Sequence, residues 1–197
     1  MLDGLIAIDQ SVTLFINSMH TPFTDNLWSF VTNKSVWFPL YAVIIGIIFW
    51  RLGWKKALVA VVSLALTILC VDQFANFIKD DVVCRLRPCN DPSMILRGLH
   101  IVEPAHPKYC YGFFSGHAAN SFAFAMASTM ILRKDHRLKW NGYAAAVFVW
   151  AALVALSRIF VAKHFFGDVL VGAIVGTIMA WAITRLVFAI AAKLGIK

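Results

Sequence analysis

The chain has 197 residues, of which 60% are hydrophobic and only 14% are charged, and its mean hydropathy is +0.75. Soluble domains usually carry about 25% charged residues, so this composition argues against a soluble protein and predicts an integral membrane protein built as one bundle of helices. The net charge of +8 indicates basic cytoplasmic loops, anionic lipid contacts or an anionic substrate. It does not indicate nucleic-acid binding, because the basic residues are dispersed between hydrophobic segments.

Hydrophobic and polar stretches alternate along the chain. Residues 5–19 mix apolar side chains with Asp9 and Asn17, which is typical of an amphipathic helix lying at the membrane interface. Thr21-Pro22 ends this helix, and Thr24 or Asp25 is placed to cap the next one. We expect about five membrane-spanning helices, at 26–51 (with its apolar core at 36–50), 56–78, 115–132, 141–157 and 167–190.

The loops between the spans predict the topology. The loops at 51–56 and 133–140, the second including Arg137, are short and basic, so both should be cytoplasmic. The C-terminus, with Lys193 and Lys197, then falls on the same side. The N-terminus and the polar segments 79–113 and 158–166 share the opposite face. The segment 79–113 is no continuous helix, because it contains Pro88, Pro92, Pro104 and Pro107.

The four cysteines do not have the paired spacing of a zinc site. Cys70 falls in an apolar segment and is expected to pack there. The other three share the polar loop: Cys110 pairs with Cys84 or Cys89 if the loop faces an oxidising compartment, and free thiols are the alternative.

Three groups of polar residues lie at helix ends on the same predicted face, although they are far apart in the sequence. Ionisable residues at membrane depth are costly and usually functional. The groups are Lys79 with Arg85, Arg87 and Pro88; Ser115 with Gly116 and His117; and Arg158 with His164 and Asp168.

Each group suits phosphate chemistry. Arginine offers a planar fork of donors that matches phosphate oxygens. Ser115 and Gly116 open a helix, where free backbone N–H groups and the positive end of the helix dipole favour an anion. His164 and Asp168 are four residues apart, so on a helical turn the carboxylate can orient the imidazole and raise its basicity. His117 is then available to protonate a leaving oxygen.

These residues resemble the three signature motifs of the type-2 phosphatidic acid phosphatase superfamily, which also includes the vanadium haloperoxidases. The third motif, Ser-Arg-x5-His-x3-Asp, matches in full from Ser157 to Asp168. The second is usually Pro-Ser-Gly-His, and here Phe114 replaces the proline. The first is usually Lys-x6-Arg-Pro, and here seven residues separate Lys79 from Arg87. Either the helix end shifts so that Lys79 reaches the site, or Arg85 supplies that charge.

The resemblance spans roughly residues 56–180 and implies a single membrane-embedded phosphatase domain over residues 1–197, with its core motifs at 79–168. It implies His164 as the nucleophile, Asp168 orienting it and His117 as the general acid. It further implies a phosphohistidine intermediate and no metal or other cofactor. The residues that it implies for phosphate binding are Lys79, Arg87, Ser115, Gly116 and Arg158.

The chain is therefore expected to be an all-α lipid phosphatase of the cell envelope, in the bacterial inner membrane with its site on the periplasmic side. Its substrate would be an anionic phospholipid or a polyprenyl phosphate, cleaved as a phosphomonoester or a pyrophosphate. The chain is short, with little beyond the core of the superfamily, and in this it resembles bacterial undecaprenyl-diphosphate phosphatases. This resemblance favours undecaprenyl diphosphate as the substrate. Phosphatidylglycerophosphate, phosphatidate and lipid A phosphate stay open.

Two other functions are compatible with an anion pocket. One is a non-enzymatic binder or transporter of anionic lipid. The other is a vanadate-dependent haloperoxidase, against which the membrane spans argue because those enzymes are soluble. The sequence predicts no oligomeric state.

Overall fold

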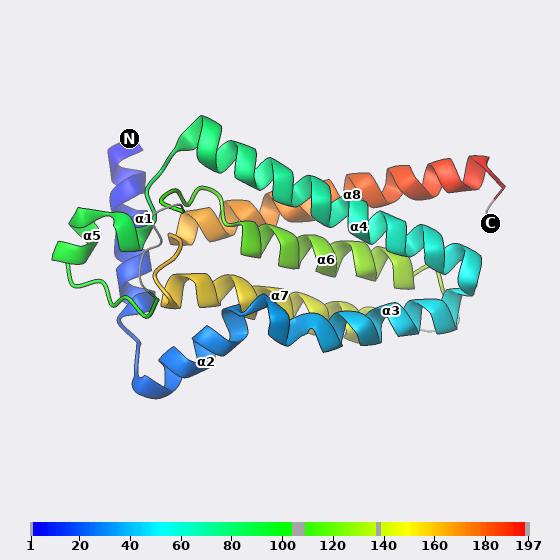
Figure 1. The fold of residues 1–197 in the computed structure, drawn as a ribbon, viewed down its shortest axis with the longest axis horizontal. Coiled ribbons are helices and arrows are strands. Elements are labelled where there is room, and N and C mark those ends of the chain that lie inside the picture. The colour runs from blue at the N-terminus through cyan, green and yellow to red at the C-terminus, as the bar shows by residue number, and fades with distance from the viewer. Residues whose placement is uncertain (1, 104–108, 137–138, 196–197) are drawn as a thin grey trace.

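The computed structural model describes residues 2–103, 109–136 and 139–195, and within them it contains eight α-helices and no β-strand (Figure 1). The predicted all-α architecture is confirmed. Pro104, Pro107, Arg137 and Lys197 lie outside the described residues. The helices are α1 (Leu2–Asn17), α2 (Pro22–Thr32), α3 (Phe38–Leu52), α4 (Trp54–Phe77), α5 (Pro92–Leu96), α6 (Gly116–Leu132), α7 (Asn141–Phe160) and α8 (Phe166–Lys193).

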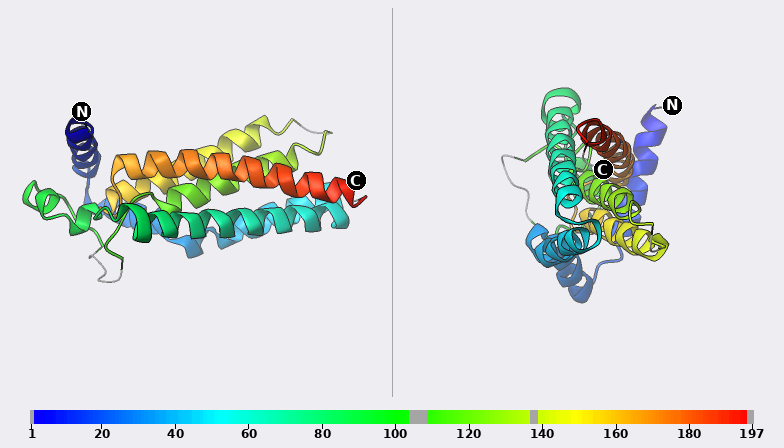
Figure 2. Two further views of the ribbon diagram at one scale, coloured as in Figure 1. Left: turned by 90° about the horizontal axis from the view of Figure 1, so that it is seen from above. Right: turned by 90° about the vertical axis from the view of Figure 1, so that its right-hand side faces the viewer.

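The long helices lie side by side along one axis, with α6 in the middle, packed against α4, α7 and α8 (Figures 1 and 2). Four segments are long and apolar enough to cross a membrane: Lys34–Leu52, Trp54–Val83, Asn141–Phe160 and Phe166–Lys193. The fifth expected span is α6, whose 17 residues lie at the short end of the spanning range. Its surface is largely covered by its neighbours, and the whole forms an integral membrane bundle.

Two glycines let α8 approach α6 backbone to backbone. A Cβ atom at Gly176 would lie 2.1 Å from the carbonyl oxygen of Ala119, and one at Gly172 would lie 2.6 Å from that of Ser115. Small residues four apart are a common device for close packing of membrane helices. The contact aligns the start of α8 with the start of α6, and the N–H of Ser115 donates to the carbonyl of Asp168 at 2.9 Å. Two of the three sequence motifs are thereby joined.

The first predicted span, 26–51, is not one helix. The chain leaves helical geometry at Asn33, whose side chain accepts a hydrogen bond from the N–H of Ser35, and a 3₁₀ helix, Lys34–Trp37, follows. Pro39 then occupies the first turn of α3, where proline costs no helical hydrogen bond. The prediction of one continuous helix was wrong because an asparagine cap and a first-turn proline together start a new helix.

The second predicted span is longer than expected. Beyond α4 the chain continues as a π-helix, Ile78–Val83, instead of entering a polar loop at residue 79. A π-helical turn holds more residues than an α-helical one. The wider turn accommodates the extra residue that separates Lys79 from Arg87 in the first motif.

The two ends of the bundle differ. At one end α1 lies across the helix ends, packed against α7 and α8 (Figures 1 and 2). Its residues Leu5, Ile8 and Phe15 are more than half exposed, which agrees with a helix at the membrane interface. The loop between α3 and α4 and the C-terminal end of α8 lie at the opposite end, as the predicted topology requires.

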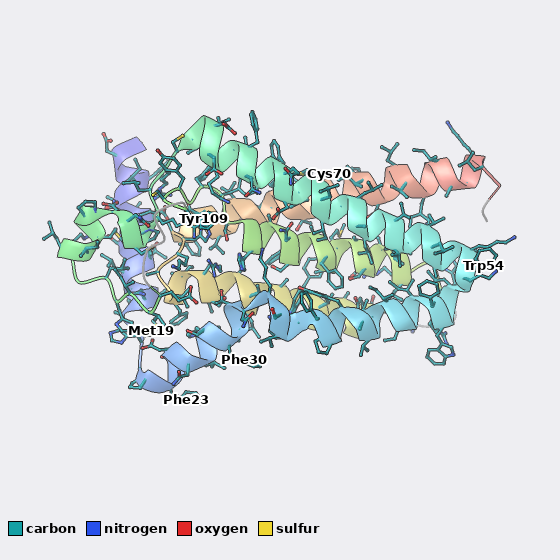
Figure 3. The ribbon with its side chains drawn as sticks, in the orientation of Figure 1. Met19, Phe23, Phe30, Trp54, Cys70 and Tyr109 are labelled. Carbon is teal, nitrogen blue, oxygen red and sulfur yellow. The ribbon has the colours of Figure 1, made fainter. Side chains whose placement is uncertain are left out.

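Large apolar side chains are exposed along the outside of the bundle. Phe23 and Phe30 of α2 and Trp54 at the opposite end are each more than half exposed (Figure 3). Cys70, which was expected to pack within its apolar segment, is exposed on α4 (Figure 3). Cys84 and Cys89 form no disulfide; their thiols contact the Asp80 carbonyl and the Asn90 side chain.

Candidate active site

A cavity of about 380 Å³ opens at the end of the bundle crossed by α1. Five of its twelve lining residues are Lys or Arg, and the only acidic one among the described residues is Asp72. An excess of partly buried cations over carboxylates favours an anionic ligand. The lining residues are Lys34, Asp72, Asn76, Lys79, Arg87, Cys89, Tyr109, Gly116, His117, Arg158, Lys163 and His164.

The first and second motifs meet through a short antiparallel pairing of the backbone. Leu86 and Tyr111 form an isolated β-bridge, and the N–H of Arg87 donates to the carbonyl of Cys110 at 2.9 Å. The Nε of Arg87 also donates to the Tyr111 carbonyl at 2.9 Å. The pairing fixes the guanidinium of Arg87 beside the start of α6.

His164 and Asp168 form the buried centre of the site. The Nδ1 of His164 lies 3.6 Å from Oδ2 of Asp168, and the side chains are 3% and 0% exposed. This distance exceeds a hydrogen bond, and such contacts often tighten only when a substrate binds. The same Oδ2 accepts from the N–H of Phe165 at 3.0 Å. Because Nδ1 faces the carboxylate, Nε2 is the nitrogen left to react.

The protonation of His164 follows from its surroundings. Burial lowers the pKa of His164 well below the ordinary imidazole value, and the nearby cations Arg158 and Arg87 lower it further. The imidazole is therefore neutral at neutral pH. A neutral imidazole keeps the lone pair that a nucleophile needs.

Arg158 is buried at the end of α7 and is 6% exposed. Its Nη1 donates to the hydroxyl of Thr32 on α2, whereas its Nε has no hydrogen-bond partner among the described residues. A buried donor without a partner is costly unless a ligand satisfies it. The arrangement leaves one donor of the guanidinium fork for an anion.

The start of α6 contributes the second motif. Gly116 and His117 line the cavity, so the positive end of the helix dipole faces it. Ser115 is fully buried and does not line the cavity; its Oγ caps α6 by accepting from the N–H of Ala118 at 3.4 Å. The predicted contact of Ser115 with phosphate stays a prediction, and its observed contacts are to α6 and to Asp168.

The two candidate cations of the first motif lie on different sides of the His164–Asp168 pair. Lys79 lines the cavity, where its Nζ donates to Oδ1 of Asn76 at 3.1 Å. Arg85 lies behind the pair and donates to Asp168 at 3.0 Å and to Asp9 at 2.7 Å. Of the two alternatives, the geometry favours Lys79 as the cavity cation.

A second, larger cavity of about 630 Å³ continues from the first into the bundle. Its walls are mostly apolar side chains of α3, α4 and α6, such as Tyr41 and Phe124. Lys34, Asp72 and His117 line both cavities. A cation-rich pocket thus adjoins an apolar chamber, which suits a molecule with an anionic head and an apolar tail.

Within the part of the chain that the structure describes, one cluster outside these cavities has side chains close enough to hold a metal ion: His20, Asp25 and His100. The two imidazole rings are stacked, with centroids 3.7 Å apart and planes at 8° to each other. An imidazole coordinates an ion in the plane of its ring, so two nearly parallel stacked rings do not converge on one ion.

Residues 56–191 match the model of the PAP2 superfamily, which covers more than half of the chain. The chain belongs to the PAP2 superfamily. The resemblance inferred from the motifs is confirmed.

Two curated relatives of this PAP2 protein are both lipid A 4'-phosphatases. That of Bacteroides thetaiotaomicron is 36% identical over 181 residues, covering 92% of this chain and 77% of the relative. That of Porphyromonas gingivalis is 25% identical over 178 residues, covering 90% of this chain and 72% of the relative. These relatives support a membrane lipid phosphatase, a phosphoric ester hydrolase, and neither a non-enzymatic binder nor a haloperoxidase.

Two solved structures share the fold. Aquifex aeolicus LpxE superposes with a TM-score of 0.61 at 24% identity, covering 89% of this chain and 93% of that one. The first transmembrane PAP2-type phosphatidylglycerolphosphate phosphatase from Bacillus subtilis gives a TM-score of 0.67 at 18% identity, covering 93% and 86%. The membrane helix bundle is therefore that of PAP2 proteins.

Several residues of this PAP2 site were not found from the sequence. Asp72 is an ionisable residue within a membrane span, and the rule that flagged His164 would have flagged it too. The sequence did not indicate Lys34 as a site residue, because the span 26–51 was predicted to be one continuous helix. The four remaining lining residues carry no signal that separates them from ordinary interfacial residues; they are Asn76, Cys89, Tyr109 and Lys163.

Gly112 is a further residue that the motifs did not point to. A Cβ atom there would lie 3.2 Å from Oδ2 of Asp168, 3.2 Å from Cγ of Arg87 and 3.5 Å from Nδ1 of His164. The backbone of Gly112 thus covers the His164–Asp168 pair at a distance that leaves little room for a side chain.

Proposed function

We propose that this PAP2 enzyme removes phosphate from a lipid A-type glycolipid, through a covalent phosphohistidine at His164. The observation that carries the proposal is the junction of the two cavities, where a phosphate pocket meets an apolar chamber. The 36% identity to a lipid A 4'-phosphatase supports the glycolipid class. It shifts our preference from undecaprenyl diphosphate, which stays in the substrate panel below.

The reaction has two steps. First, Nε2 of His164 attacks phosphorus; an N–P bond forms, the P–O bond to the lipid breaks, and His117 donates a proton to the departing oxygen, which leaves as an alcohol. Second, His117 takes a proton from water, the water oxygen attacks phosphorus, and the N–P bond breaks to release inorganic phosphate. The bound phosphate itself favours the protonated form of His117 in the first step.

The cations of the pocket stabilise the phosphoryl group. Arg158 and Arg87 would bind its equatorial oxygens, where fixed donors act on charge in a site with little water. Lys79 and the N-terminus of α6 at Gly116 would complete the cradle. The unpartnered Nε of Arg158 supports this role, because a phosphate oxygen would satisfy it.

The larger cavity suits an acyl chain of the substrate. Its apolar walls would surround the acyl chain as the bilayer interior does, so the acyl chain would stay out of water while the headgroup reaches His164. The exposed apolar outside of α3 and α4 supports an orientation in which the site lies at headgroup depth. The short basic loops at the other end support a periplasmic site in an inner membrane.

Asp72 favours a sugar headgroup over a polyprenyl one. Its Oδ1 accepts from Asn120 at 2.9 Å and its Oδ2 from Asn76 at 3.3 Å, so each oxygen retains one acceptor position. A sugar offers hydroxyl donors beside the phosphate. A polyprenyl diphosphate offers none and would bring further negative charge next to this carboxylate.

The test is phosphate release by the purified full chain in detergent micelles. The panel is lipid A 4'-monophosphate, undecaprenyl diphosphate, phosphatidylglycerophosphate and phosphatidate, with His164→Ala as the inactive control. We expect the highest kcat/KM for the lipid A phosphate. A higher kcat/KM for undecaprenyl diphosphate would overturn the glycolipid assignment, and equal activity of His164→Ala would overturn the proposed chemistry.

A further inference from the structure

The interfacial helix α1 is connected to the catalytic pair by one arginine. The guanidinium of Arg85 donates from Nη2 to Oδ2 of Asp9 at 2.7 Å and from Nη1 to Oδ1 of Asp168 at 3.0 Å. It also lies over the ring of Phe165, 3.8 Å from the centroid. Arg85 therefore bridges a carboxylate of α1 and the carboxylate that faces His164.

The α1 side of this bridge is itself fixed. The other oxygen of Asp9, Oδ1, accepts from the N–H of Gly167 at 2.7 Å. One turn further along α1, the hydroxyl of Thr13 accepts from the N–H of Phe166 at 3.0 Å and donates to the Asp9 carbonyl at 2.7 Å. These contacts hold α1 on the first N–H groups of α8, the helix that carries Asp168.

The position of Asp168 depends on this bridge. Its carboxylate is fully buried, whereas the side chains of Arg85 and Asp9 are 25% and 15% exposed. A buried carboxylate needs charged or hydrogen-bonding partners. Arg85 holds Oδ1 and the N–H of Phe165 holds Oδ2, so the carboxylate plane is set on both sides and Oδ2 faces His164.

We propose that Arg85 and Asp9 are positioning residues for the phosphatase reaction. They fix Asp168, and through it the tautomer and orientation of His164, so that α1 is a working part of the active site as well as an interfacial anchor. The inference rests on the proposed role of His164 as nucleophile. It assigns a function to two residues outside the three sequence motifs.

Arg97 provides a matched control. It also ties a loop to α1, donating to Gln10 at 3.0 Å and to the Ser11 hydroxyl at 3.4 Å, but neither contact reaches Asp168. If α1 only needs to be attached, loss of Arg97 and loss of Arg85 should have similar effects. If Arg85 positions the catalytic pair, only its loss should slow the chemical step.

The experiment measures kcat and KM for Arg85→Met, Arg85→Lys, Asp9→Asn and Arg97→Met, each with its thermal unfolding midpoint in detergent. We expect Arg85→Met to lower kcat roughly 10–100-fold, the size of effect known for partners that orient metal ligands, with KM changed less than about threefold. Arg85→Lys should recover part of kcat, and Arg97→Met should keep kcat within about twofold. The double variant Asp9→Asn/Arg85→Met should be no slower than Arg85→Met alone, because both act through one contact.

Each other outcome overturns the inference. An equal fall of kcat in Arg97→Met and Arg85→Met would mean that attachment of α1 is what matters. A rise in KM with kcat unchanged would place Arg85 on the substrate. The proposed function fails separately, if wild-type protein releases phosphate and His164→Ala does so at the same rate.

Discussion

At the end of the bundle where α3 turns into α4, the charges are paired or exposed, whereas the cavity at the end crossed by α1 is lined, among the described residues, by five cations and one carboxylate. Arg51 pairs with Asp135 at 2.6 Å, and Lys134 lies over the ring of Phe188 at 4.1 Å. At the other end, the buried Arg158 donates to the hydroxyl of Thr32 and forms no ion pair with a carboxylate of the described residues, and Lys79 lines the cavity. The same residue types make local contacts at one end, whereas at the other end we propose that they bind an anion.

The difference lies in the surroundings of the charges. A cation that already has a carboxylate or water as partner gains little free energy when a phosphate binds. A buried cation with an unsatisfied donor gains much more. Charge counts alone therefore do not identify the site. The following changes test whether the two ends differ in the way described.

Arg158→Met should have the largest effect. Removing a buried donor to the phosphoryl group is expected to lower kcat/KM by about 10²–10³-fold, the range seen for donors to a developing anion. The exposed Arg133 at the opposite end, which donates to Asn141 at 3.3 Å, is the control. Phosphate release by Arg133→Met should stay within about twofold of the wild-type rate. A comparable loss of activity in both variants would contradict the proposed difference between the two ends.

Gly176→Ala should disturb the packing that joins the motifs. The added methyl group would lie 2.1 Å from the Ala119 carbonyl oxygen, so α6 and α8 must separate, at a cost of about 1–3 kcal/mol. The measurement is the midpoint of thermal unfolding in detergent. Gly46→Ala on α3, with nothing within 4 Å of the new methyl group, should be neutral or stabilising. Equal midpoints for the two variants would contradict the close packing.

The pH profile tests the electrostatics of the buried end. Because burial and then Arg158 and Arg87 hold the pKa of His164 down, its neutral form persists below the ordinary value of about 6.5. The acid limb of kcat/KM should therefore lie below that pH in the wild type and move to higher pH in Arg87→Met, where one cation is gone. The free substrate ionises identically in both assays and kcat/KM depends on free enzyme and free substrate, so the shift reports on the enzyme. An unchanged limb would contradict this reading.

Asp135→Asn should have the smallest effect on activity. It removes a charge partner of Arg51 and is expected to cost about 1.5–3 kcal/mol of stability, as for a hydrogen bond to a charged group. Because the pair lies at the end away from the cavity, kcat/KM should change less than about twofold. A large loss of activity would show that the two ends are coupled.

Much of this arrangement could be predicted from the sequence. Hydropathy predicted where the helices lie, and the spacing of His164 and Asp168 predicted that these two side chains face each other. The exact register of the first motif could not be predicted, because a π-helix at Ile78–Val83 absorbs one residue. Nothing in the local pattern near Lys79 distinguishes a π-helical from an α-helical turn.

The contributions of distant segments were the part that sequence reasoning missed. In the sequence, Asp9 was one polar residue of a predicted interfacial helix. Only the fold brings it into contact with Arg85 and Gly167. Lys34 reached the cavity because the first span breaks at Asn33. Contacts between residues about 80 or 160 positions apart leave no periodic signal in one sequence.

The most direct test of the account is to trap the intermediate. The purified protein is mixed with a lipid phosphate carrying labelled phosphorus, quenched in alkali, digested, and its phosphopeptides are identified by mass spectrometry. We predict an acid-labile, alkali-stable label on the peptide that contains His164, absent in His164→Asn. Label on a different residue, or turnover by His164→Asn at the wild-type rate, would contradict the assignment of His164 as the nucleophile.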